Sequence, residues 1–395
     1  MVCGRTHPLE TEQPTSLSVL DKLANNLSSL YEDLFTLMLD PLRANSVTPR
    51  LLTSEYSALA AQKGQKISVP LTSAMTVGDV TPGVTPPTPA DMTPSGVDVE
   101  MANWKYVTFQ LSDKDKFDVR DGNMPKVLSK AMSTLVDAID TSILTAASQG
   151  AGSATGTAGT SPFASAILAV QANKILNRNK VDKAGRHVMF DADAEANLLA
   201  LPEFANSQFV GDYQAMTNGT FDGNRRVGSQ WWQNQNIVTH TKGVGSGYVT
   251  NGSQAAGATS IVVQTGTGAL VAGDVISFAA DTANKYVVAE AYTGGAGTVT
   301  INSPGLVNTI PTGNAITVNN DHVANIAFSS DSIAFASRPL PASDANAMTD
   351  TLVDPVSGLA VRLETMRGWM QDLWVVSALW GVKAVRSEGI VKILG

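Results

Sequence analysis

The sequence predicts an α+β fold with a small β-barrel domain inserted into it. A helical pattern of apolar residues runs without interruption over 123–150. An extended segment with a proline-rich loop precedes this helix, and a linker and a mixed α/β stretch follow it. The third observation is a stretch at 243–320 that is almost free of charge and contains several closely spaced strand-like runs.

The helix at 123–150 is expected to be the structural spine of the protein, with no chemistry on it. Its apolar residues recur at the spacing of one helix face: Leu128, Ala131, Met132, Leu135, Val136, Ile139 and Ile143. Four charged residues are expected on the opposite side: Lys126, Lys130, Asp137 and Asp140. Asn123 suits the N-cap and Gly150 the exit. At 1.5 Å per residue the helix spans roughly 40 Å, enough to cross a domain.

The N-terminal region combines a polar tail, 1–15, with a second amphipathic helix predicted at 16–40 and ended by Pro41. The apolar stripe of this helix packs either on its own domain or on a neighbouring subunit or assembly partner. In the second case, four leucines of the stripe are candidate inter-subunit contacts: Leu20, Leu23, Leu27 and Leu30.

Two strand-like runs, at 66–71 and 97–111, flank a proline-rich connection. Prolines stiffen the chain and cannot donate to a sheet ladder. A two-stranded ribbon with such a tip would reach outward, and it needs a surface to lie on because an isolated ribbon is marginally stable in water. The prolines are therefore candidate inter-subunit residues as well: Pro82, Pro86, Pro87, Pro89 and Pro94.

After a linker at 150–162, the sequence predicts a helix at 163–176, a buried strand at 187–190 and a further helix from Asp193. Three acids at 191–195 could suggest a hard-cation site. The preferred interpretation is that they favour the N-terminus of the helix that follows.

The stretch at 243–320 is rich in Gly, Thr, Val and Ala. Its strand-like runs are 259–264, 274–280, 285–292, 297–302 and 315–319. Short strands at close spacing indicate a small barrel or sandwich. Mixed structure lies on both sides of the stretch, so we interpret it as an inserted domain.

The chain then returns to mixed structure and ends in an apolar run at 372–394. Trp374 and Trp380 in this run are expected to be core anchors rather than a ligand cage. The same interpretation applies to Trp231 and Trp232.

Composition favours an assembly protein. Of 395 residues, 43% are apolar and only 16% charged, so other chains rather than water can cover much of the surface. The net charge of −8 offers no basic footprint for nucleic acid. A single cysteine, Cys3, excludes a disulfide framework. No signal-peptide pattern or membrane-spanning apolar run occurs, so we expect synthesis in the cytoplasm and no membrane association.

No motif for catalysis or for a cofactor is evident. The four histidines, His7, His187, His240 and His322, are scattered, and none has a second ligand at metal spacing. The run at 243–248 does not fit the G-x-S-x-G elbow, and phosphate-binding and metalloprotease motifs are missing. We expect a protein that is not an enzyme and uses no cofactor or metal.

The order of these parts resembles the major capsid (coat) proteins of tailed double-stranded DNA phages. These proteins have the Hong Kong 97-type fold, and the closest resemblance is to the podophage branch with an inserted β domain. The N-terminal helix, the extended loop and the spine helix match, and 216–243 resembles the approach to the insertion. The run at 273–279 resembles its hallmark strand, and 331–343 and 378–394 are similar to the family's last strands.

The resemblance implies a domain organisation. An N-terminal tail and arm helix (1–40) precede an extended loop with peripheral-domain strands (41–112) and the spine helix (113–150). The axial domain comprises 151–242 and 321–370, the insertion 243–320, and the last strands 371–395. The relatives' loop that bridges capsomers corresponds to 281–286, which is short and weakly charged here.

The implied function is a shell of pentamers and hexamers around packaged double-stranded DNA, without sequence-specific DNA binding. The implied partners are further copies of the chain, an internal scaffolding protein and a portal, with a decoration protein left open. The implied location is the virion capsid, assembled in the host cytoplasm.

Two alternatives remain. An encapsulin-like nanocompartment shell shares the fold but usually lacks the insertion. A secreted β-rich surface protein or adhesin would suit the Thr- and Gly-rich middle, but it does not suit the long helix or the missing signal peptide. An enzyme that degrades polysaccharide would need a clustered carboxylate pair, which the sequence spacing does not show.

Overall fold

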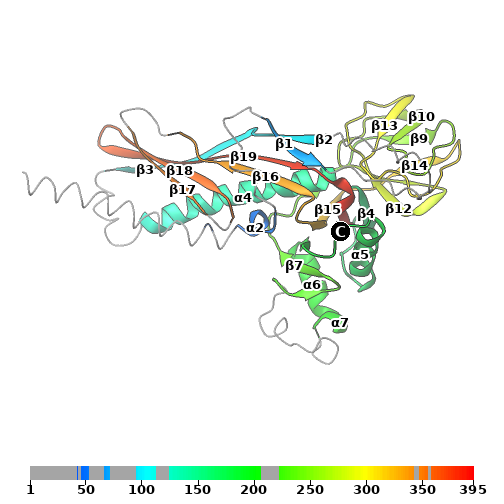
Figure 1. The fold of residues 1–395 in the computed structure, drawn as a ribbon, viewed down its shortest axis with the longest axis horizontal. Helices are drawn as coiled ribbons and strands as arrows, with labels where there is room; N and C mark the ends of the chain where they lie inside the picture. The colour runs from blue at the N-terminus through cyan, green and yellow to red at the C-terminus, as the bar shows by residue number, and fades with distance from the viewer. Residues whose placement is uncertain are drawn as a thin grey trace, which may run out of the picture.

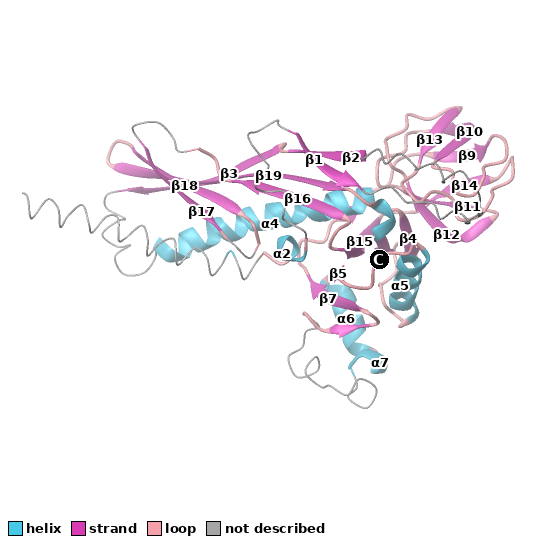
Figure 2. Ribbon diagram, in the orientation of Figure 1, coloured by secondary structure: helices cyan, strands magenta, loops and turns pink. Residues whose placement is uncertain are grey.

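The computed structural model describes residues 42, 46–52, 66–71, 95–112, 124–205, 222–341, 347–354 and 357–395. Within this part, a long helix lies along a long sheet, a second α/β region adjoins one end of that sheet, and a β-rich lobe follows beside it (Figure 1). Figure 2 shows how few of the helices are long: most of the described chain is strand and loop.

The long sheet is built around β19 (Gln371–Ala384). Its first part pairs on one edge with β18 (Ala360–Arg367), which in turn pairs with β17 (Ala347–Val353). Its last part pairs on the same edge with β16 (Ile333–Arg338). On its other edge, β19 pairs from Gln371 to Trp380 with β3 (Asn103–Ser112). All these pairings are antiparallel.

The helix α4 (Met124–Gly150) packs against one face of this sheet. The seven predicted apolar residues of α4 are all at most 5% exposed, and they share one core with Trp380 and Val376 of β19. Trp380 is completely buried and its indole Nε1 donates a 2.7 Å hydrogen bond to Ser142 Oγ on the helix. Burying a side chain of this size is worth several kcal/mol, which fixes the helix on the sheet.

The second α/β region has a mixed sheet. Its strand order is β4 (Ser153–Gly156), β20 (Ile390–Leu394), β15 (His322–Ser329), β5 (Arg186–Phe190), β7 (Ser229–Gln233) and β6 (Arg225–Arg226), and β8 (Thr239–His240) also pairs with β15. Helices α5 (Ile167–Arg178) and α6 (Ala192–Ala200) share a core with one face of it, and the short α7 (Pro202–Ala205) adds Phe204. Residues of the other face, such as Met189 and Ile326, join the core of α4. The two cores therefore meet across this sheet.

The segment that follows has its own strands and its own core. These are β9 (Ser246–Thr250), β10 (Ser260–Thr267), β11 (Val275–Phe278), β12 (Asp281–Val287), β13 (Gly297–Thr300) and β14 (Ala315–Val318). Their order is β13-β10-β9-β14-β11-β12. Just past the ends of β12 and β13, Val288 and Ile301 form a bridge that joins the first and last strands of this order. Tyr248, Phe278 and Tyr286 are each 1% exposed in the apolar cluster that these strands enclose.

Three smaller elements complete the described chain. β1 (Lys66–Leu71) and β2 (Ser95–Glu100) form an antiparallel two-stranded ribbon, and its Ile67 and Val69 pack on residues of β16. The one-turn helix α2 (Thr48–Leu51) lies against α4. A 3₁₀ turn, Ser387–Gly389, leads into β20.

Several expectations need correction. Asp140 is 1% exposed instead of lying on the solvent side, because the loop after β7 supplies a hydrogen-bonding partner for it there. The run at 97–111 is two strands rather than one, broken at Met101 and Ala102. The helix expected at 163–176 begins at Ile167, because Phe163 adopts a left-handed backbone conformation (φ 59°). The segment 281–286 is not a loop, since it forms most of β12.

Candidate functional site

The nine residues predicted to contact other subunits lie outside the described residues. They are Leu20, Leu23, Leu27, Leu30, Pro82, Pro86, Pro87, Pro89 and Pro94. The structure brings other groups together in two places: a buried polar junction beneath the β-rich lobe, and an exposed apolar surface on the long sheet.

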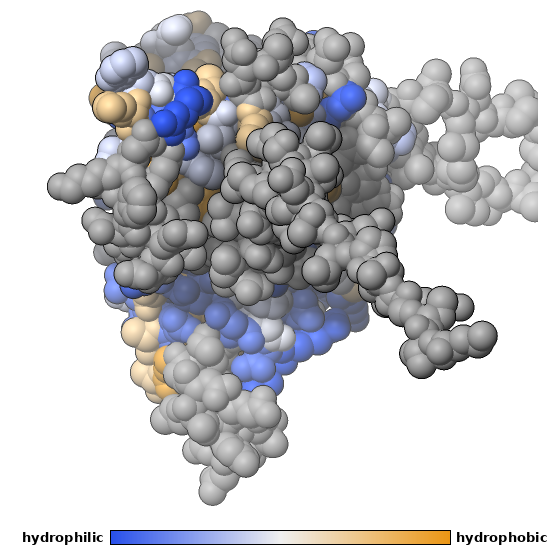
Figure 3. All heavy atoms as spheres, turned by 90° about the vertical axis from the view of Figure 1, so that its left-hand side faces the viewer, coloured by the Kyte–Doolittle hydropathy of each residue, from blue (hydrophilic) through white to orange (hydrophobic). Residues whose placement is uncertain are grey.

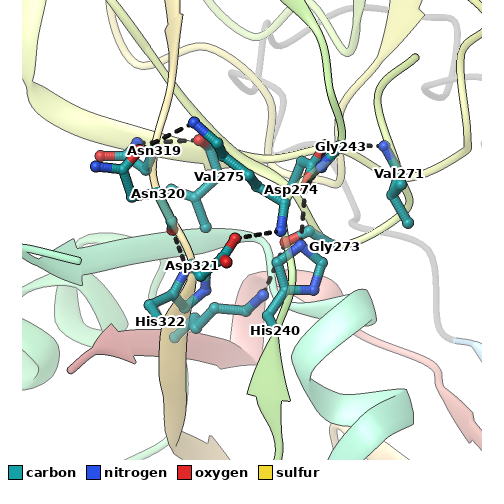
Figure 4. A network of polar contacts seen from close by, with 12 residues as sticks. His240, Gly243, Val271, Gly273, Asp274, Val275, Asn319, Asn320, Asp321 and His322 are labelled. Atoms are coloured by element: carbon teal, nitrogen blue, oxygen red, sulfur yellow. Dashed lines mark hydrogen bonds and ion pairs between the residues drawn. The ribbon is translucent and has the colours of Figure 1, made fainter. Parts of the chain in front are cut away.

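The junction is centred on the carboxylate of Asp274, at the start of β11 (Figure 4). Its Oδ1 accepts a 2.8 Å hydrogen bond from His240 Nε2, and both oxygens lie 3.1 Å from the backbone N–H of Gly243. Oδ2 also accepts the backbone N–H of Val271 at 2.8 Å. His240 and Gly243 belong to the chain that leads into the lobe, so one side chain ties this connection to β11.

The chain leaving the lobe is held at the same place (Figure 4). The backbone N–H of Asn319 donates to Val275 O at 2.8 Å. Lys242 donates its backbone N–H to Asp321 Oδ1 at 2.8 Å and its Nζ to Asn320 Oδ1 at 2.9 Å. His322 pairs with His240 in the β8–β15 ladder, and their rings are 5.2 Å apart. Both connections are thus fixed to each other and to β11.

Burial shifts the pKa values of the titratable groups at the junction. Burial alone would raise the pKa of Asp274, but the hydrogen bonds from His240, Val271 and Gly243 outweigh it, so the pKa of this carboxyl is lowered. Lys392 of β20 is completely buried, and its Nζ donates to Gly273 O at 2.8 Å. Burial lowers the pKa of Lys392 to about 7, and burial also lowers the pKa of His322 to about 4. Asp274 is therefore held ionised and His322 neutral.

This arrangement suits a structural joint. In the described part of the chain, no three His, Cys, Asp or Glu side chains converge as metal ligands would, and the acids at 191–195 form no such group. Sequence reasoning treated His240 and His322 as scattered, whereas strand pairing places them side by side. This proximity follows only from the pairing of β8 with β15, which are about eighty residues apart in the sequence. His187 is buried with its Nε2 3.1 Å from Ser330 Oγ.

A second polar contact fixes α4 to the chain after β7. Asn234 Nδ2 donates to Asp140 Oδ2 at 3.0 Å and to Thr48 Oγ1 at 3.1 Å. Burial raises the pKa of Asp140 to about 7, against the lowering effect of the hydrogen bonds from Asn234 and Thr48. Three segments distant in sequence therefore meet at one titratable group.

The four tryptophans that the sequence assigned to the core are buried or half-buried. Trp380 is fully buried and Trp374 is 7% exposed. Trp231 is 1% exposed among Phe163, Phe190 and Phe204, and Trp232 is half-buried against the core of α4.

The long sheet exposes large apolar side chains. At the turn between β18 and β19, Trp369 is 88% exposed and Met370 66%. On the edge strand β3, Tyr106 is 68% exposed and Trp104 49%. In Figure 3, which views the molecule from the side that is on the left in Figure 1, hydrophobic residues lie among hydrophilic ones on this end. Large apolar side chains exposed at these two places of the sheet are candidates for contact with a neighbouring chain.

A surface depression lies on the opposite face of β3, the face toward α4. Val107 and Phe109 of β3 line it together with Val127 and Ala131 of α4. Lys126 and Lys130 stand at the same depression. None of the helices in the described part of the chain is both long and apolar enough to cross a membrane.

No protein-family model matches the chain, and no curated protein matches it either. The chain is similar to a solved structure from Mycobacterium phage Che8, with a TM-score of 0.50 and 16% identity over 88% of this chain and 90% of that one. It is also similar to a capsid structure of the cyanophage P-SCSP1u (TM-score 0.47, 13% identity, 87% and 86% covered). A virus-like particle from Pyrococcus furiosus has a TM-score of 0.42 and 8% identity (92% and 98% covered).

The similarity to the Mycobacterium phage structure covers nearly the whole of both chains. It therefore concerns the complete arrangement of spine helix, long sheet and second α/β region rather than one shared motif. The fold is the α+β fold of Hong Kong 97-type phage capsid proteins, as the order of parts in the sequence predicted.

Proposed function

We propose that this chain is a major capsid protein, which assembles through contacts between identical copies into pentamers and hexamers of an icosahedral shell around packaged double-stranded DNA. The observation that carries the proposal is the fold, shared with the Mycobacterium phage structure over about nine-tenths of both chains. The exposed apolar surface of the long sheet supports it, because obligate assemblies bury large apolar areas between subunits.

The domain boundaries follow from the same proposal. The peripheral domain contains α4 and the long sheet, and the axial domain contains the second α/β region with α5 and α6. Residues 243–320 form an inserted β-barrel domain. Its separate apolar cluster and the bridge between Val288 and Ile301 support this assignment.

The proposed role is physical rather than catalytic. The virion capsid is the proposed location, after assembly in the host cytoplasm. A scaffolding protein would act on the inner side and a portal would occupy one vertex. The acidic chain would not hold the packaged DNA tightly, which lets the DNA slide during packaging.

The test is negative-stain electron microscopy combined with sedimentation of the purified protein, with and without its scaffolding partner. Closed or partial shells built of rings of five and six are the expected result. Protein that stays monomeric under every condition, partner included, would contradict the proposal. Particles that form only around a host enzyme as cargo would favour the nanocompartment alternative instead.

A further inference from the structure

Charged residues of the second α/β region are sorted to the two ends of its parallel strands. β5 and β7 run side by side in the same direction, with His187 opposite Gln230 and Phe190 opposite Gln233. Their first residues therefore lie at one end of the sheet and their last residues at the other. Five residues per strand separate these ends by about 15 Å.

The end where β5 and β7 begin is basic. Its exposed cations are Arg178, Lys180, Lys183 and Arg225, and Lys174 precedes them on α5. Internal contacts hold this end together: Arg225 Nη2 donates to Lys183 O at 3.3 Å, and Asn173 Nδ2 donates to Val227 O at 2.6 Å. The acids beside these cations are Asp182, Glu388 and Asp331; Glu388 O accepts from Asn179, and Asp331 is paired with Arg386 at 3.1 Å.

Arg186 makes this end rigid without adding to its outer surface. Its side chain is buried and donates to Asn173 and Asn177 of α5 and to the carbonyls of Val181 and Asp182. The exposed cations around it are therefore carried on a fixed frame rather than on a loose loop.

The end where β5 and β7 finish is acidic. Asp191 follows β5 directly, and Asp193 and Glu195 stand in the first turn of α6. Asp222 lies at the same end, because its Oδ1 accepts the backbone N–H of Gln233, the last residue of β7. Asp193 and Asp222 are exposed.

One exposed apolar residue accompanies the basic end: Val227, beside Asn173, is 36% exposed. Ile167 and Val170, 59% and 52% exposed, lie in the first turn of α5, away from its last residue Arg178 at the basic end. Exposed apolar side chains on the same region as the charged ends suit a protein–protein contact.

We propose that the basic end of β5 and β7 docks on the acidic end of the same region in a second copy of this chain. The inference rests on the proposed function, and it assigns the contact that closes the rings. A ring of identical subunits needs a heterologous interface, in which each copy uses one surface toward the preceding copy and a different surface toward the next. Opposite charges at opposite ends of one region meet that requirement and reject a head-to-head contact.

The test uses two charge-reversed variants of the full chain. In the first, Lys183→Glu with Arg225→Glu makes both ends acidic. In the second, Asp193→Lys with Glu195→Lys and Asp222→Lys makes both ends basic. Each variant alone is expected to fold, with an unchanged circular dichroism spectrum, and to lose shell formation by at least about tenfold, because like charges then face each other.

Mixing the two variants gives the sharpest outcome. Within a ring the variants must alternate, so only rings with an even number of subunits can close. Hexamers are expected to return without pentamers, as sheets or tubes in electron micrographs, whereas a single chain carrying all five reversals is expected to form closed shells again. Reversal of Glu290, an exposed acid of the β-rich lobe, serves as the charge control and is expected to leave assembly intact.

Other outcomes overturn the inference in recognisable ways. If the unaltered chain forms shells and both variants do so as well, the inference fails while the proposed function stands. If the control fails like the variants, net charge and not this contact is responsible. If the first variant assembles normally but its particles hold less DNA, the basic end contacts nucleic acid instead. If the unaltered chain forms no shells, the proposed function fails and the inference fails with it.

Discussion

The β-rich lobe and the long sheet differ in how far their large apolar side chains are buried. In the lobe, the large side chains Tyr248, Phe278 and Tyr286 are buried within the segment's own cluster. In the long sheet, α4 covers one face and the β1–β2 ribbon covers part of the other at β16, but Trp369 and Tyr106 remain 88% and 68% exposed. The lobe thus buries its large side chains within one chain, whereas the long sheet leaves large apolar side chains exposed at its turn and on β3.

The lobe and the long sheet also differ in how their polar groups are paired. Inside the lobe, Tyr286 donates its hydroxyl to Asp281 Oδ2 at 2.7 Å and accepts the backbone N–H of Val307 at 3.1 Å. Burial and this bond to Asp281 raise the pKa of Tyr286. By contrast, β3 pairs along one edge only in the described part of the chain. Such an edge is a place where another chain can add hydrogen bonds.

The largest expected effect comes from Trp380, which joins the long sheet to α4. Trp380→Ala removes a fully buried side chain and its bond to Ser142, at a cost of about 3–5 kcal/mol. We expect soluble subunits to be lost at ordinary temperature, measured as the yield after centrifugation and the urea midpoint of what remains. A midpoint equal to that of the unaltered chain would show that α4 and the sheet do not depend on this contact.

Phe278→Ala tests whether the lobe is a separate unit. The side chain is 1% exposed and packs edge-on to Tyr286 at 5.7 Å between ring centroids, so its loss should also cost about 3–5 kcal/mol. We expect differential scanning calorimetry to show one transition moved to lower temperature while a second keeps its place. A single transition moved as a whole would mean that the lobe and the rest unfold together.

The pH dependence of stability should contain a contribution from Asp140. Its pKa is raised from 3.8 to about 7 by burial, so the folded chain keeps a proton that the unfolded chain releases. The stabilisation is complete below about pH 4 and is lost as the pH rises through 7. Asp140→Asn cannot ionise and can still accept from Asn234. At pH 8 we expect this variant to be more stable than the unaltered chain by about 1–3 kcal/mol.

Urea unfolding at pH 4, 6 and 8 measures this difference, with Asp137→Asn on the exposed face of α4 as the matched control. A variant whose advantage is the same at all three pH values would contradict the assignment to Asp140.

The smallest effect on the free subunit is expected at the turn of the long sheet. Trp369→Ser removes a side chain that is 88% exposed, so the unfolding free energy should change by less than about 0.5 kcal/mol. The yield of shells should fall nevertheless, because we expect a neighbouring subunit to bury this indole on assembly. Equal shell yield by light scattering would remove this turn from the assembly surface.

The sequence predicted those elements whose signal is local. The apolar stripe of α4 and the short strand-like runs of β10, β11, β13 and β14 each lie within about thirty residues, and the structure has them close to where they were expected. The order of these local elements was also enough to indicate the fold family.

What the sequence could not provide depends on partners far along the chain. Asp140 has the spacing of a solvent-facing residue, and only Asn234, 94 residues away, makes its burial acceptable. Likewise, β20 pairs in parallel with β4, although residues 157–389 separate the two strands in the sequence. The junction around Asp274 needs β8, β11, β15 and β20 to be in place together. No single stretch carries that information.

The contrast between the lobe and the long sheet is tested most directly by hydrogen–deuterium exchange on free subunits and on assembled particles. We expect backbone amides of β3 and of the turn at 366–371 to become strongly protected on assembly, while the strands of the lobe keep the protection that they already have. The opposite pattern, with new protection confined to the lobe and none along β3 or the turn, would contradict the account of the long sheet as the surface that neighbouring subunits complete.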